Sequence, residues 1–173
     1  MDSHIRTRLM AITAIAARYC RILENCRDLQ RQELIREIAS ILPRIYLEFI
    51  DLVPDRNDTE ESYPDSMSAI SYIDEDYYES IRRNLETVIG EEDTFLDTFE
   101  EDMKYSDTPI AASISESLAD IFQPLYNFIS AVKDSDGEQA ETAYMECHDN
   151  FVQYWSQTLC NVMRPINRIL FSF

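Results

Sequence analysis

Polar residues at helical spacing run through the segment 109–132. Glu116, Asp120, Gln123 and Asn127 follow one another three or four positions apart, which places them in one row along a helix. Two carboxylates in such a row could hold a divalent metal ion or bind a small ligand. The simpler interpretation is a solvated helix face, so the place of this helix in the fold decides between the two.

Two apolar rows on the same segment favour a central position for the helix. A helix turns about 200° over two residues, so the polar row points away from the main core row, from which it is offset by two positions. That core row is Ile114, Leu118, Ile121, Leu125, Phe128 and Val132. A second apolar row holds Phe122, Tyr126 and Ile129. A polar row on a central helix lines a cleft or meets another polar element, because buried carboxylates require partners.

The single tryptophan, Trp155, belongs to the last long helical segment and shares an apolar row with Val152, Leu159 and Val162. We therefore expect it to pack near the helix 109–132. His148 lies on the same row and is interpreted as a core or edge histidine, with a general base beside a carboxylate as the alternative. The predicted cleft consists of Glu116, Asp120, Gln123, Asn127, Tyr154 and Trp155.

Residue counts exclude several kinds of catalytic site. The chain has two glycines, Gly90 and Gly137, which are too few and too far apart for a Walker loop, a dinucleotide fingerprint or a nucleophile elbow. Its two histidines form neither an H-E-x-x-H motif nor the Glu-x-x-His pair of di-iron bundles. The sequence therefore assigns no catalytic residue, no metal site and no cofactor.

Two further motifs are weaker than they look. The pairs Glu138/Glu141 and Glu146/Asp149 resemble magnesium-binding pairs of helical nucleotide hydrolases, but they lie too close together on one helix to face each other across a cleft. The four cysteines form no C-x-x-C pair, so a zinc knuckle is disfavoured and reduced, structural thiols are expected. They are Cys20, Cys26, Cys147 and Cys160.

The net charge of −18 is concentrated in the middle of the chain. Residues 1–50 sum to +2, residues 51–107 to −15 and residues 108–173 to −5. A field of this sign repels nucleic acid, which is bound mainly through its phosphates. The acids either provide solubility and partners for the N-terminal arginines, or form a surface that binds a basic protein or mimics the charge of nucleic acid.

Apolar periodicity predicts helices throughout. We expect an all-α, antiparallel bundle of about six helices in a single domain covering residues 1–173, with an acidic loop at about 54–73. A short acidic helix with Phe95, Phe99 and Met103 inward should follow Gly90, and Pro109 should open the helix that carries the polar row. The start of the chain resembles a signal peptide, but its helical spacing continues past any cleavage point, which indicates a cytoplasmic protein with no membrane span.

Two stretches resemble a known family. They are Ser115-Glu116-Ser117-Leu118-Ala119-Asp120-Ile121-Phe122-Gln123 and Asn150-Phe151-Val152-Gln153-Tyr154-Trp155. They are similar to a bacterial all-helical family catalogued as domain of unknown function 5063. The resemblance covers nearly the whole chain and implies the fold without an activity. Pro124 and Ser156 stand where the family commonly has an acidic residue and a glycine, and Pro124 should kink the helix directly after the polar row.

Two functions are carried forward. The first is a non-enzymatic protein-interaction module of a bacterial cytoplasm, which uses its acidic surface and the cleft beside the helix 109–132 to bind a basic protein surface. The alternative is a carboxylate-dependent, divalent-metal protein that binds or hydrolyses a small ligand, centred on Glu116 and Asp120.

Overall fold

The computed structural model describes residues 3–54, 71–97 and 110–172. Its helices are α1 (Ser3–Glu24), α2 (Arg31–Asp51), α3 (Glu75–Ile89), α4 (Ile114–Asp134), α5 (Ala140–Asn150) and α6 (Ser156–Leu170). Two 3₁₀ turns, η1 (Cys26–Asp28) and η2 (Gly90–Asp93), connect or extend them. The prediction of an all-α bundle in a single domain is confirmed.

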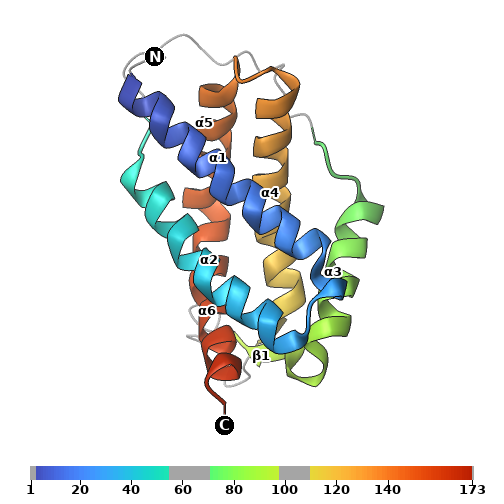
Figure 1. The fold of residues 1–173 in the computed structure, drawn as a ribbon. Coiled ribbons are helices and arrows are strands. Elements are labelled where there is room, and N and C mark those ends of the chain that lie inside the picture. The colour runs from blue at the N-terminus through green and yellow to red at the C-terminus, as the bar shows by residue number, and fades with distance from the viewer. Residues whose placement is uncertain (1–2, 55–70, 98–109, 173) are drawn as a thin grey trace.

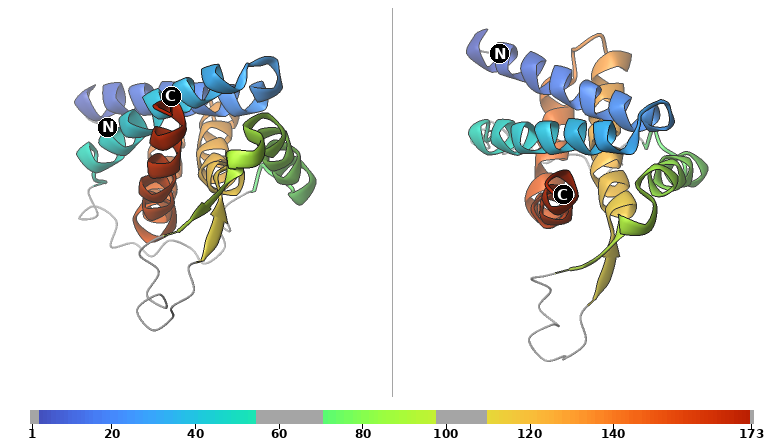
Figure 2. Two further views of the ribbon diagram at one scale, coloured as in Figure 1. Left: turned by 90° about the horizontal axis from the view of Figure 1, so that it is seen from below. Right: turned by 60° about the horizontal axis from the view of Figure 1, so that its bottom comes forward.

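The helices form two layers. Helices α1 and α2 are joined by a short turn and run side by side across α4 and the rod made of α5 and α6 (Figures 1 and 2). Helix α3 packs along α4. Because α4 contacts α1, α3, α5 and α6, its two apolar rows are both covered, as a central helix requires.

A π-helix, η4 (Phe151–Trp155), joins α5 to α6 without a break. The backbone stays in the right-handed helical region at Asn150, Phe151, Trp155 and Ser156. The rod therefore continues through Pro165 to Leu170. Pro43 likewise lies inside one helix, α2.

The segment after Gly90 differs from the sequence-based expectation. Thr94–Leu96 form strand β1, which pairs antiparallel with β2 (Ala111–Ser113), where a short acidic helix was predicted. Helix α4 consequently begins at Ile114 rather than at Pro109. The error has a simple cause, since three-residue strands are too short to show an alternating pattern. Phe99, Met103 and most of the predicted acidic loop (55–70) lie outside the described residues.

The buried core contains one contiguous cluster of side chains from every described helix. Helix α3 has a defined residue at each end. The Asp74 side chain accepts from the Tyr77 backbone N–H at the start of α3, and Gly90 ends that helix with a φ of 74°.

Among the described residues, no helix is both long and apolar enough to cross a membrane.

All four cysteines are free thiols, and three of them are buried. Burial raises the pKa of Cys20 and Cys147, which keeps these thiols protonated and unreactive. We expect one fast-reacting thiol per native chain, Cys160, when labelling with a colorimetric disulfide reagent is followed at pH 8. The Cys160→Ser protein should lose the fast phase, whereas unfolded protein should react at four positions. Rapid labelling of a second native thiol would contradict the burial.

Candidate functional site

A groove runs between α4 and the rod of α5, η4 and α6, and we call it the α4–α6 groove. It has two adjoining sections with volumes of about 420 and 460 Å³. The Trp155 section is lined by residues that include Asp120, Gln123, Asn127, Asn150, Tyr154 and Trp155. The Glu116 section is lined by residues that include Asp97, Glu116, Asp120, Gln153, Tyr154 and Asn161. The sections share Asp120, Tyr154 and Thr158, so they form one continuous surface.

The groove brings together all six residues of the predicted cleft. Glu116, Asp120, Gln123 and Asn127 line it from α4, while Tyr154 and Trp155 line it from η4. Tyr154 is 67% exposed at the rim, whereas Trp155 is 3% exposed. The polar row of α4 is therefore one wall of a groove between two helices.

Apart from Tyr154 and Trp155, the residues of the opposite wall were not predicted from the sequence. Asn150, Gln153, Gln157 and Asn161 line the groove from α5, η4 and α6. They recur at three- or four-residue spacing, so a second polar row was visible in the sequence, beside the apolar row of Trp155. Asp97, which follows β1, was missed because its position depends on a short sheet; its Oδ1 accepts from Asn161 Nδ2 at 2.9 Å.

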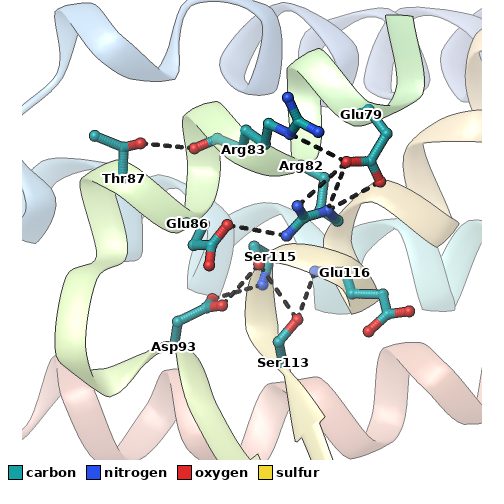
Figure 3. Close-up of polar contacts among 9 residues, drawn as sticks. All are labelled: Glu79, Arg82, Arg83, Glu86, Thr87, Asp93, Ser113, Ser115 and Glu116. Atoms are coloured by element: carbon teal, nitrogen blue, oxygen red, sulfur yellow. Dashed lines mark hydrogen bonds and ion pairs between the residues drawn. The ribbon is translucent and has the colours of Figure 1, made fainter. Parts of the chain in front are cut away.

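A buried carboxylate fixes the start of α4. Asp93 is 7% exposed and accepts from the Ser115 backbone N–H at 2.8 Å and from the Ser115 hydroxyl at 2.7 Å. The Ser113 side chain accepts from the Glu116 backbone N–H at 3.1 Å, as an N-cap residue does. Figure 3 shows these contacts converging at the first turn of α4, where a negative charge also favours the positive end of the helix dipole. They fix the backbone of the turn that carries Glu116, which lines the Glu116 section.

Helix α3 and the residues before it do not line the groove, but they hydrogen-bond to two of its side chains. The Tyr78 hydroxyl donates to Asp120 Oδ1 at 2.6 Å, and the Tyr72 backbone N–H donates to Asn127 Oδ1 at 2.9 Å. The pKa of Tyr78 is raised well above its ordinary value. Burial is the largest cause, followed by the hydrogen bond to Asp120 and the charge of Asp120. Tyr78 therefore remains a hydrogen-bond donor wherever Asp120 is ionised, and both α4 side chains are oriented before any ligand arrives.

The arginines of α3 form ion pairs within their own helix. Arg82 contacts Glu79 at 3.1 Å and Glu86 at 3.0 Å, and Arg83 contacts Glu79 at 3.3 Å (Figure 3). These pairs lower the pKa of Glu79 and raise that of Arg82. They leave the nearby carboxylates of the groove without a neutralising cation from this helix.

The floor of the groove is built by the π-helix. Ser156 N–H donates to the carbonyl of Phe151, five residues earlier, which is the bond that defines the wider turn. The Trp155 ring packs edge-on against Phe49 of α2 and against Phe151, with centroid distances of 4.9 and 4.6 Å. Trp155 therefore lies at the boundary between the core and the groove. Turns of this kind occur frequently at functional sites.

His148 does not belong to the groove. It is 5% exposed and stacks against Phe49 with a ring distance of 6.3 Å, beside Tyr144 and Phe151. This is the position of a core histidine, the simpler of the two interpretations. Within the described ranges, no group of three or more His, Cys, Asp or Glu side chains is arranged to hold a metal ion.

These features define a class of protein: a single helical domain whose central helix and last helical rod enclose a polar, carboxylate-bearing groove. The chain belongs to the family described as domain of unknown function (DUF5063), whose model matches residues 4–172. The resemblance seen in the sequence is therefore confirmed. The crystal structure of protein BF1032 from Bacteroides fragilis is similar, with a TM-score of 0.77 and 26% identity, covering 96% of this chain and 94% of that one. No curated protein gives a match.

Proposed function

We propose that this chain is a non-enzymatic protein-interaction module of the bacterial cytoplasm, and that its α4–α6 groove binds a basic segment of a partner protein. One observation carries the proposal. Asp97, Glu116 and Asp120 line the groove, and none of the described residues that line it is Lys, Arg or His. An acidic groove on a chain with a net charge of −18 attracts and orients cationic partners.

The composition of the groove supports binding over a reaction. Its other polar groups are carboxamides, hydroxyls and the indole N–H of Trp155, which hydrogen-bond at neutral pH without gaining or losing a proton. Tyr154 at the rim is an exposed aromatic residue of the type enriched in protein interfaces. The four free thiols suit a reducing compartment, and the structural neighbour BF1032 comes from a bacterium.

The alternative, a divalent-metal protein centred on Glu116 and Asp120, makes a different prediction. A metal site would show saturable binding of Mg²⁺ or Mn²⁺ by calorimetry that disappears in Asp120→Asn, without any peptide. A protein-interaction groove would show binding of basic peptides that weakens with added salt, because exposed charges are screened. Both experiments compare wild type with Asp120→Asn.

Asp120→Asn should leave the stability nearly unchanged and weaken partner binding about tenfold. Asp120 is exposed, and an asparagine oxygen can still accept from the Tyr78 hydroxyl, so little stability is lost. Binding should fall because a charge-assisted contact contributes on the order of 1–3 kcal/mol. The measurements are thermal unfolding by circular dichroism and anisotropy of labelled peptide pools rich in Lys and Arg.

Asp28→Asn is the matched control, since Asp28 is an exposed carboxylate of η1 outside the groove. It removes the same charge and should change peptide binding little. Equal weakening by both variants would mean that net charge, and not the groove, attracts the peptides. A loss of several kcal/mol of unfolding free energy in Asp120→Asn would instead assign Asp120 a structural role.

A further inference from the structure

The hydrogen bonds from Tyr78 and Tyr72 determine which polar atoms of Asp120 and Asn127 are left for a ligand. The two ends of the groove therefore differ in hydrogen-bonding character. Asp120 has Oδ1 occupied by the Tyr78 hydroxyl, so its second carboxylate oxygen is the atom left to accept from a ligand. Asp97 and Glu116 line the same section as Asp120. The Glu116 section therefore accepts hydrogen bonds and attracts a cation.

Asn127 offers the opposite chemistry. The Tyr72 backbone N–H is a donor, so the Asn127 atom that it contacts must be the carbonyl oxygen, and the amide nitrogen Nδ2 is left for the groove. An Asn Nδ2 group donates and does not accept. The Trp155 section therefore presents a hydrogen-bond donor at its Asn127 end.

Trp155 adds a second donor to this section. Its indole N–H is buried and has no hydrogen-bond partner among the described residues, although the side chain lines the groove. A buried donor without a partner is costly, and such groups are rare in native proteins. The unpaired indole N–H therefore marks Trp155, beside Asn127, as the part of the groove lining where an acceptor is missing.

The spacing of acceptor and donor fits an extended chain. Asp120 and Asn127 are seven residues apart on α4, which corresponds to about 10 Å along the helix axis. An extended polypeptide covers roughly that distance in three residues. A helical partner fits poorly, because its interior carbonyls already accept bonds from its own N–H groups, whereas an extended segment leaves them available.

We infer that the groove binds an extended polypeptide segment that places a basic side chain in the Glu116 section and, about three residues away, a backbone carbonyl at Asn127. This inference rests on the proposed function and specifies its partner. The carbonyl is a neutral backbone group rather than a terminal carboxylate, since three carboxylates already line the groove and would repel another anion.

Asn127→Asp tests the inference against simple charge attraction. The new carboxylate can still accept from the Tyr72 N–H, but it cannot donate, and it adds a negative charge to the groove. The probe is a labelled pool of acetylated, amidated hexapeptides with Lys fixed at the second position, compared with a pool that has Glu there. We expect wild type to bind the Lys pool alone and Asn127→Asp to bind it roughly three- to tenfold more weakly, the effect of one lost hydrogen bond.

Asn167→Asp is the control, because Asn167 is an exposed residue of α6 that does not line the groove and receives the same added charge. It should bind the Lys pool as well as wild type or slightly better. Tighter binding by Asn127→Asp than by wild type would overturn the inference. It would still agree with the proposed function, in which the groove binds a basic segment. Failure of wild type to bind the Lys pool would overturn both. Circular dichroism should give Asn127→Asp the same melting temperature as wild type. The weaker binding is then due to the lost donor and not to loss of folded protein.

Discussion

Truncation of Trp155 to alanine should lower the free energy of unfolding by about 3–5 kcal/mol, as for other large side chains removed from a core. The indole is 3% exposed and packs against Phe49 and Phe151. Its removal leaves a void between α2 and η4 where these rings meet. Urea unfolding followed by circular dichroism is the appropriate measurement, because the variant has no tryptophan fluorescence.

Trp155→Phe provides the control, since phenylalanine keeps an aromatic ring against Phe49 and also removes the buried indole N–H. We expect it to lose less than half as much stability as the alanine variant. An alanine variant within about 1 kcal/mol of wild type would be incompatible with the burial of this ring.

Asp93→Ala should cost about 3 kcal/mol of unfolding free energy. The change removes two hydrogen bonds to a buried acidic side chain and leaves the N–H and hydroxyl of Ser115 without their acceptor. It also removes an acidic side chain that contacts the first turn of α4 from η2. Chemical denaturation of wild type and variant at neutral pH measures the difference.

Ser113→Ala separates this buried contact from ordinary helix capping. Ser113 accepts from the Glu116 N–H in the same turn but is only half-buried, so its loss should cost about 1 kcal/mol. If the two variants lose the same stability, the carboxylate of Asp93 contributes no more than a surface cap, and its burial has no special effect on α4.

The sequence predicted the helices because their apolar spacing is long and regular. The row of Leu34, Ile38, Ile41, Ile45 and Phe49 predicts α2, and each of these side chains is buried. Proline positions were less informative. Pro43, Pro124 and Pro165 all lie inside helices, because packing on neighbouring helices can offset the lost hydrogen bond.

The candidate groove was predicted in part. The polar row of α4 could be found because Glu116 and Asp120 share a helix with two apolar rows. The contacts that orient this row could not, since Tyr78 and Asp120 are 42 positions apart and nothing in either local pattern marks the pair. Asp93 was equally hidden, because a buried acid in an acidic segment has the same sequence signature as an exposed one.

The π-helix makes the length of the last helical rod as important as its residue types. One extra residue in a helix advances everything beyond it by about 100°. Beyond Phe151–Trp155, the face with Leu159, Val162, Ile166 and Ile169 points into the core, and the face with Thr158 and Asn161 points into the groove. The wide turn accommodates one residue more than a regular α-helical turn, so deletion of a single residue from this segment preserves both faces only if the wide turn becomes a regular one. A family member one residue shorter here is therefore expected to have an uninterrupted α-helix in place of the π-helix.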